Sequence, residues 1–245
     1  MTPTTVPVIF DLDGTLVDPA GGITDGIAAA LTELGLPVPA KDRLDAMIGP
    51  KLGHSLREIA GVPPEQLEDA IRIYRRHYLA TGIARSRLYP GIRALLEALV
   101  GAGRPVAVAT QKPEGMARTV LEQHGIAGLF HTIRGSAADE TAAPGAQSGK
   151  ASIVAAALAD LTARHGQDAR RAVMVGDRYQ DVAGAAANGL ACIGVGWGFA
   201  PDGELHAAGA VEVVHTTLAL HATITRLSEC PGTEALNEVH TIGNV

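Results

Sequence analysis

The chain alternates between short runs of apolar residues and longer stretches in which apolar residues recur every three or four positions. The short runs predict strands that are buried on both faces, since a strand covered by helices on both sides has no polar face. The expected strands are 6–10, 106–109, 132–135, 173–175, 191–195 and 211–214. The stretches between them predict helices at 92–100, 114–124, 151–164 and 181–188. This order predicts an α/β fold, with a parallel sheet and helices on both faces.

One part of the chain lacks this alternation. Residues 19–87 contain helical patterns only, at 23–34, 43–48, 55–59 and 65–81. We therefore predict a core domain formed by residues 1–18 and 88–227, and a helical bundle at 19–87 inserted into it. The segment 137–149 is expected to be a surface loop, and 228–245 a weakly ordered C-terminal tail.

Composition and charge exclude several classes of protein. Apolar residues make up 47% of the chain and charged residues 19%, which is typical of a globular protein. The formal net charge of −6 comes without a basic stripe, so a nucleic acid polymer is not an expected partner. No signal peptide or membrane-spanning segment is evident, so we expect a cytoplasmic protein that binds no membrane. We expect it to be a monomer or a homodimer.

Polar side chains follow three of the predicted strands. Asp11 and Asp13 come after the first strand, Thr110 after the strand at 106–109, and Asp177 after the strand at 173–175, with Asp181 one helical turn later. In an open parallel sheet, ligands bind outside the carboxyl ends of the strands. We therefore expect these side chains to converge on one site.

A cluster of carboxylates needs a positive partner, because like charges repel and burial strengthens the repulsion. Asp11, Asp13, Asp177 and Asp181 supply only oxygen ligands, a set that suits Mg²⁺. The hydroxyl of Thr110, backbone N–H groups after the strands and Lys150 at a helix start suit a phosphate group. The sequence thus predicts a site in which Mg²⁺ lies between the acids and a phosphate.

The spacing of Asp11 and Asp13 allows two roles. One carboxylate can attack phosphorus, while the other gives a proton to the leaving oxygen and later takes one from water. Gly14 is expected to keep the following turn compact, so that backbone N–H groups reach the transferring phosphoryl group.

These motifs resemble those of the haloacid dehalogenase (HAD) superfamily of phosphohydrolases, in the phosphoglycolate phosphatase-like branch with a helical (C1) cap. The resemblance implies a Rossmann-like core and a four-helix cap that closes over the site. It also implies a Mg²⁺-dependent phosphatase that hydrolyses a small-molecule phosphate monoester through an aspartyl-phosphate intermediate. The matching segments are DLDGTLVD (11–18), VAVATQKP (106–113), SGKASIV (148–154) and MVGDRYQDVAGAAANGL (174–190).

The resemblance also implies a role for each site residue. Asp11 would be the nucleophile and a metal ligand, and Asp13 the general acid and base, with its backbone carbonyl on the metal. Thr110 and the amide of Gln111 would hold phosphate.

Three further residues complete this implied site. Lys150 would neutralise the nucleophile and the phosphate, although the long segment before it leaves Lys112 as an alternative. Asp177 would complete the Mg²⁺ site, and Asp181 would support it through waters or by orienting Lys150.

The segment IGPKLGHSL (48–56) resembles the cap loop that approaches the active site in this branch. Lys51 is expected to meet a second anionic group of the substrate, as in 2-phosphoglycolate, and Ser55 to donate a hydrogen bond to it. Other activities on the same scaffold stay open: a 5′-nucleotidase, a phosphotyrosine-directed phosphatase or phosphoryl-transfer protein, and a phosphomutase.

Overall fold

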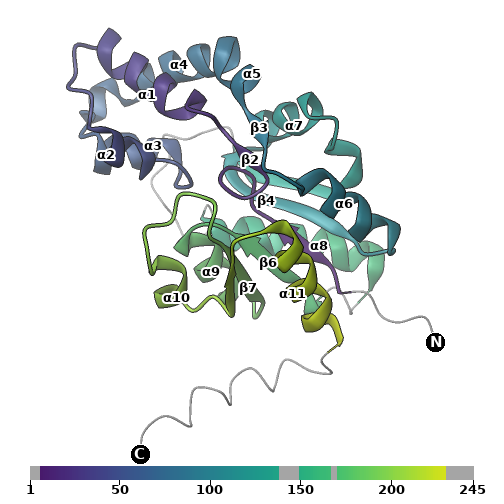
Figure 1. Ribbon diagram of the computed structural model, residues 1–245. Coiled ribbons are helices and arrows are strands. Elements are labelled where there is room, and N and C mark those ends of the chain that lie inside the picture. Colours follow the sequence, from purple (N-terminus) through teal and green to yellow (C-terminus); the bar gives the residue numbers. More distant parts are fainter. Residues whose placement is uncertain (1–5, 138–148, 167–169, 230–245) are drawn as a thin grey trace, which may run out of the picture.

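The computed structural model describes residues 6–137, 149–166 and 170–229. Six parallel strands form one sheet in the order β5-β4-β1-β6-β7-β8 (Figure 1). This confirms the predicted α/β fold with a parallel sheet. The strands are β1 (Val8–Phe10), β4 (Val106–Pro113), β5 (Thr132–Ser136), β6 (Val173–Gly176), β7 (Ala191–Val195) and β8 (Glu212–Val214).

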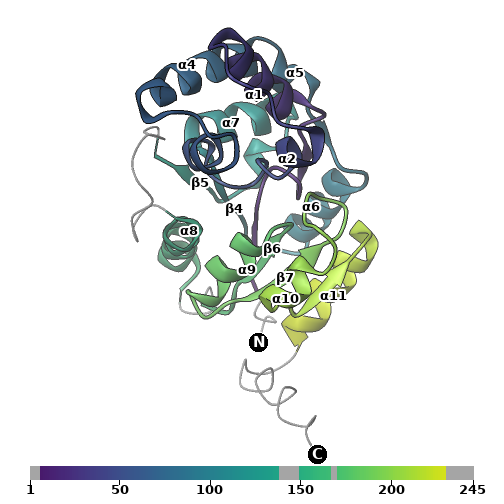
Figure 2. The same ribbon diagram turned by 90° about the vertical axis from the view of Figure 1, so that its left-hand side faces the viewer.

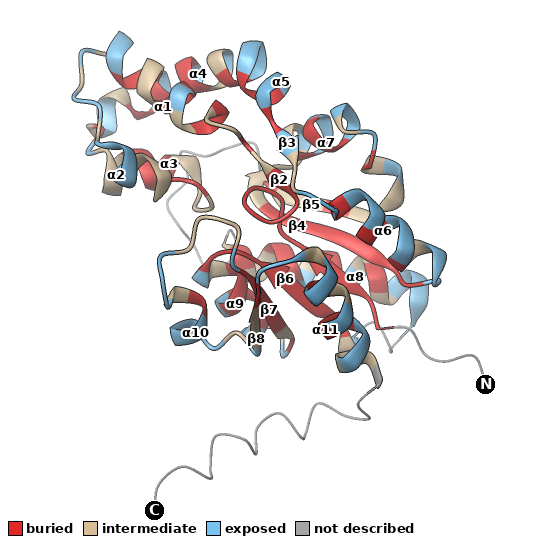
Figure 3. Ribbon diagram, viewed as in Figure 1, coloured by how far each residue is buried: buried red, intermediate tan, exposed pale blue. Residues whose placement is uncertain are grey.

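Helices cover both faces of this sheet. Successive residues of a strand point to opposite faces, so each buried strand places apolar side chains on both. Val8 and Phe10 belong to one buried cluster, and Ile9 to a second cluster on the other face. The first face carries α6 (Ile92–Gly101), α7 (Glu114–Gln123) and α11 (Thr217–Glu229). The second carries α8 (Lys150–His165), α9 (Tyr179–Ala186) and α10 (Glu204–Ala208). The strands β1 and β6 and most of β4 and β7 are buried between these layers, as Figure 3 shows.

Two helices of the core were not predicted, α10 and α11. Helix α11 continues to Glu229, two residues past position 227, where we expected the core to end. The rest of the expected tail, 230–245, and most of the expected loop, 138–148, lie outside the described residues. No helix among the described residues is both long enough and apolar enough to cross a membrane.

Between β2 (Val17–Asp18) and β3 (Arg87–Leu88), the chain is helical apart from its connecting turns. We refer to these helices as the cap; α1 packs against α4, and the group lies at one end of the sheet (Figures 1 and 2). The helix-only pattern predicted for this stretch is present, whereas the antiparallel pair β2–β3 beside it was not predicted. The cap helices are α1 (Gly22–Glu33), α2 (Lys41–Asp45), α3 (Leu52–His54, followed by a π-helical turn), α4 (Leu67–His77) and α5 (Ile83–Arg85).

The strand β1 occupies the centre of the sheet. Phe10 pairs with Val108 of β4 on one side and with Val175 of β6 on the other. The chain builds β4 and β5 on one side of β1, then returns to build β6, β7 and β8 on the other. This reversal of strand order is where open α/β sheets bind their ligands. Asp11 and Asp177 directly follow β1 and β6, whereas Thr110 lies inside β4, which continues to Pro113 instead of ending at the expected residue 109.

Candidate active site

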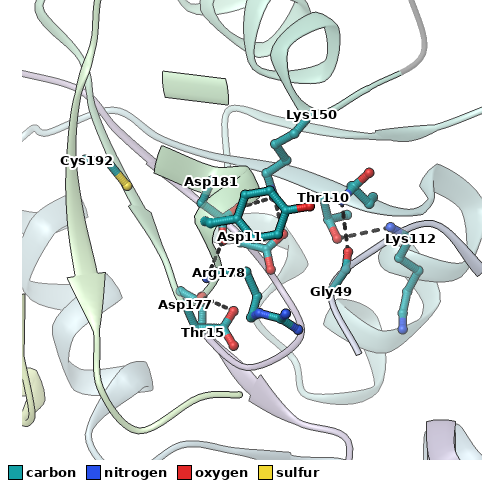
Figure 4. A network of polar contacts seen from close by, with 12 residues as sticks. Asp11, Thr15, Gly49, Thr110, Lys112, Lys150, Asp177, Arg178, Asp181 and Cys192 are labelled. Atoms are coloured by element: carbon teal, nitrogen blue, oxygen red, sulfur yellow. Dashed lines mark hydrogen bonds and ion pairs between the residues drawn. The ribbon is translucent and has the colours of Figure 1, made fainter. Parts of the chain in front are cut away.

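Three carboxylates form a buried cluster at the carboxyl end of the sheet. Asp11, Asp177 and Asp181 each offer an oxygen, and these oxygens lie within 4.8 Å of one another (Figure 4). Burial, and then the negative charges of Asp181 and Asp11, raise the pKa of Asp177 well above its usual value. Burial likewise raises the pKa of Asp181 to about 6, although Lys150 opposes the shift. The cluster is therefore short of positive charge, and its all-oxygen donors suit a hard divalent cation.

Lys150, the first residue of α8, supplies the positive side chain of this cluster. Its Nζ contacts a carboxylate oxygen of Asp11 and lies 2.6 Å from Oδ1 of Asp181. Burial alone would lower the pKa of Lys150, but the two carboxylates outweigh it and raise the pKa. Of the two lysines considered for this position, the structure thus brings Lys150 to Asp11.

Asp181 uses both of its oxygens within the protein. Oδ2 accepts a hydrogen bond of 3.0 Å from the backbone N–H of Arg178, which caps the first turn of α9, and Oδ1 pairs with Lys150. This geometry favours the role of Asp181 in orienting Lys150 over direct binding of a cation.

Asp177 is held by groups from two other loops. The hydroxyl of Thr15 donates to Oδ1 at 3.3 Å, and the backbone N–H of Phe199 donates to Oδ2 at 2.8 Å. Gly14 has φ 85°, and a Cβ there would lie 2.1 Å from Oδ2 of Asp177. The compact turn expected of Gly14 is present, and the absence of a side chain makes room for Asp177. Neither Thr15 nor Phe199 was a predicted site residue, although Thr15 lies within the first motif.

Asp13 faces a different cation, Lys112. Their Oδ2 and Nζ atoms are 2.6 Å apart, and Nζ also lies 4.7 Å from the centroid of the Tyr78 ring in the cap. Burial raises the pKa of Asp13 in spite of Lys112. Thr110, only 2% exposed, accepts a hydrogen bond of 3.2 Å from the backbone N–H of Lys112. Lys112 therefore joins the Asp13 side of the site to the cap.

A pocket lies between the cap and the core. The structure brings Asp11, Asp13, Thr110 and Gln111 together in its lining, as predicted for groups that meet a substrate. The full lining is Asp11, Asp13, Ile23, Met47, Ile48, Gly49, Pro50, Leu52, Tyr74, Thr110, Gln111, Lys112, Pro113 and Met116.

The two predicted substrate contacts of the cap lie elsewhere. Ser55 is fully buried, and its hydroxyl donates to the backbone carbonyl of Met47 at 3.3 Å. Lys51 precedes α3 and does not line the pocket, whereas its neighbours Pro50 and Leu52 do. A hydroxyl side chain satisfies its hydrogen bonds with nearby backbone groups as readily as it meets a ligand.

Two core side chains hold the cap loop by its main chain. Nη1 of Arg178 donates to the carbonyl of Ile48 at 2.6 Å, and Nε2 of Gln111 donates to the carbonyl of Gly49 at 3.1 Å. Glu204 accepts from Nε of Arg178 at 3.0 Å and fixes the guanidinium from the other side. Each donor directly follows a site residue, so the loop is anchored at the rim of the site.

Arg178→Gln should raise KM about 10-fold while lowering kcat less, because a hydrogen bond from a charged donor contributes roughly 1.5–3 kcal/mol. Loss of this hydrogen bond should loosen the cap loop, which lines the pocket. Steady-state kinetics measure the effect. Arg93→Gln is the matched control, since its guanidinium also donates to a backbone carbonyl, that of His124, away from the pocket. Equal effects of the two substitutions would contradict the role of Arg178.

The fold and the site together define a class of protein. A carboxylate lies at the end of the central strand, within a pocket, a second acid lies two residues on, and a lysine and an acidic cation site flank the first. This arrangement is that of an enzyme that transfers phosphoryl groups through an aspartate on a Rossmann-like core. Residues 8–195 match the family of haloacid dehalogenase-like hydrolases, and the chain belongs to that family. It is a phosphoric monoester hydrolase of the HAD type.

Similar proteins of known name carry several activities. The chain is 38% identical to a 5′-nucleotidase of Pseudomonas aeruginosa over 82% of this chain and 86% of that protein. It is 41% identical to the tyrosine-protein kinase PtkA of Mycobacterium tuberculosis over 92% of this chain and 72% of that protein. The crystal structure of a predicted phosphatase from Clostridium acetobutylicum superposes with a TM-score of 0.80, at 35% identity over 91% of this chain and 99% of that one.

Proposed function

We propose that this protein is a Mg²⁺-dependent phosphatase that hydrolyses a small-molecule phosphate monoester through a phosphoaspartate at Asp11. The observation that carries the proposal is the position of Asp11. This one carboxylate lines the pocket, belongs to the acidic cluster and contacts Lys150. An acid that meets both a substrate space and a cation site is placed to attack a phosphoryl group.

The cation site would be formed by Asp11 and Asp177, with the backbone carbonyl of Asp13. When bound there, Mg²⁺ would screen the negative charges of the acids and of the phosphoryl oxygens. Asp181 would support the site through Lys150, with which it pairs.

The residues of the chain divide the remaining chemistry. The carboxylate of Asp11 forms a bond to phosphorus as the ester P–O bond breaks, and Asp13 gives its proton to the leaving oxygen. Water then attacks the phosphoaspartate, Asp13 takes its proton, and inorganic phosphate leaves with Asp11 restored. Thr110 and the backbone N–H of Gln111 hold the phosphoryl oxygens, and Lys150 balances the charge of Asp11.

The proposal also covers the setting of the enzyme. We place it in the cytoplasm, as a monomer or a homodimer, with no nucleic acid polymer as a partner. The similarity to PtkA keeps phosphoryl transfer to a protein as an alternative, as the shared scaffold keeps a phosphomutase. Free phosphate in steady state separates hydrolysis from both, because a transferase or mutase leaves the phosphoryl group on another molecule.

Phosphate release from p-nitrophenyl phosphate, with and without Mg²⁺, tests the proposal. We expect release that depends on Mg²⁺, and an apparent affinity for Mg²⁺ that falls about 10-fold or more in Asp177→Asn. The metal-free variant should also melt at a higher temperature than the unaltered protein, because one of three crowded carboxylates is gone.

Asp160→Asn is the matched control for this substitution. Asp160 pairs with Arg134 at 2.7 Å and is not part of the acidic cluster. It should leave the Mg²⁺ dependence unchanged. Release without Mg²⁺, or an equal loss of affinity for Mg²⁺ in both variants, would contradict the proposed site.

A further inference from the structure

Apart from the reacting aspartates, the wall of the pocket is mainly apolar. The cap and the core both contribute, and two of the four methionines of the chain lie in this wall. Thioether side chains adapt to the shape of a ligand and make favourable contacts with aromatic rings. The apolar lining consists of Ile23, Met47, Ile48, Pro50 and Leu52 from the cap, with Pro113 and Met116 from the core.

The charged and amide groups of this wall are already engaged. Lys112 supplies the positive charge among the lining residues that the structure describes, and it pairs with Asp13 at 2.6 Å. The side-chain amide of Gln111 donates to Gly49.

A second negative charge on the substrate would therefore meet apolar side chains. Burying an unpaired carboxylate is costly, since no partner replaces the water that it loses. The same wall accepts an uncharged hydrocarbon group without that penalty, because its atoms need no hydrogen bonds.

An aromatic element also forms part of the lining. Tyr74 lines the pocket, and its ring stacks on that of Tyr78, with centroids 5.6 Å apart and planes 10° from parallel. Lys112 lies over the Tyr78 ring and also pairs with Asp13, so its charge is held between the cap and the core. A flat, apolar leaving group complements this lining.

We propose that the physiological leaving group is uncharged, apolar and ring-bearing, so that the substrate is an aryl or arylalkyl phosphate monoester rather than a carboxylated one. This inference rests on the proposed function, and it names the substrate class of that same pocket. It disfavours 2-phosphoglycolate, the substrate that the expected contact of Lys51 had suggested.

A comparison of benzyl phosphate with 2-phosphoglycolate tests the inference. Both esters release a primary alcohol, so their chemical steps are similar and the difference reports on the pocket. We expect kcat/KM for benzyl phosphate to be higher by about 10-fold or more, the range by which pockets discriminate apolar groups. An equal or higher value for 2-phosphoglycolate would overturn the inference and leave the phosphatase proposal intact.

Binding of non-hydrolysable analogues separates the two proposals further. Benzylphosphonate should bind more tightly than phosphonoacetate in isothermal titration with Mg²⁺ present. If no ester, p-nitrophenyl phosphate included, releases phosphate, the proposed function fails. The order of the two phosphonates then still decides whether the pocket selects a ring, and tighter binding of phosphonoacetate would overturn that claim.

A substitution in the wall tests the cause of the selection. Leu52 is half-buried at the start of α3, where a lysine can extend its stem along the wall. Leu52→Lys should shift the ratio of kcat/KM values toward 2-phosphoglycolate about 10-fold, because it supplies the missing positive charge. Leu52→Gln, which is polar but neutral, is the matched control and should not produce this shift. An unchanged ratio in a folded Leu52→Lys protein would contradict the charge argument.

Discussion

Asp11→Asn should lower kcat for phosphate release by about 10⁴-fold or more, the scale on which loss of a nucleophile acts in other enzymes. The substitution keeps the shape of the side chain but removes the negative oxygen that attacks phosphorus. Rapid acid quenching after mixing with a ³²P-labelled ester should find label on the unaltered protein and none on the variant.

Asp13→Asn is the matched comparison for this result. It alters the acid that pairs with Lys112 and leaves Asp11 intact. With p-nitrophenyl phosphate, whose leaving group needs little protonation, this variant should still become labelled and should lose the label slowly. Label on Asp11→Asn, or its absence from Asp13→Asn under these conditions, would assign the nucleophile elsewhere.

Lys150→Met should lower the free energy of unfolding of the metal-free protein by about 3–5 kcal/mol, as expected when one partner of a buried ion pair is removed. The reason is that Asp11 and Asp181 would then face each other with no positive charge between them. Phosphate release should fall as well. Urea denaturation, followed by circular dichroism, measures the stability.

A double-mutant cycle with Asp181→Asn sharpens this prediction. Removing the second carboxylate from Lys150→Met should recover part of the lost stability, because it relieves the repulsion between Asp11 and Asp181 that the first substitution leaves uncompensated. Strictly additive losses would mean that Lys150 and Asp181 do not interact as the structure places them. The alternative lysine can be tested in the same way, since Lys112→Met should couple to Asp13 instead.

The sheet and its acidic edge were predictable because their signals are local. Each buried strand is a short apolar run, and the residue after it occupies the edge where parallel strands end. Phe10 and Val175 are paired in adjacent strands, so Asp11 and Asp177 lie close to each other at that edge. The sequence left Lys150 and Lys112 as alternatives, and Lys150 begins α8 beside Asp11.

The contacts between cap and core were not predictable, because they depend on how two distant segments meet. Arg178 and Ile48 are 130 residues apart, and Gln111 and Gly49 are 62 apart. The pattern of apolar and polar residues in these segments does not indicate which distant residues they contact. The same limit applies to Ser55, since the sequence gives no sign of whether its hydroxyl faces the pocket or a nearby backbone carbonyl.

Helix α11 was missed for a different reason, since a local signal was present. Thr216 precedes it, and its side chain accepts a hydrogen bond of 3.1 Å from the backbone N–H of Ala219. A threonine at this place is a common start of a helix. The pattern at 217–229 is weakly amphipathic, so the threonine before the helix was a better indication of it than the spacing of its apolar residues.

The way in which the core holds the cap loop allows substrate selectivity to change while the loop keeps its position. Arg178 and Gln111 bind main-chain carbonyls, which every residue possesses, so the docking does not depend on the side chains at Met47 and Leu52. Gly49 is the exception, since its φ is 104° and a Cβ would lie 2.9 Å from Cγ of Arg178. A library of variants that changes the residues of the pocket wall but keeps Gly49, Gln111 and Arg178 should therefore yield new substrate selectivities with the catalytic residues unchanged.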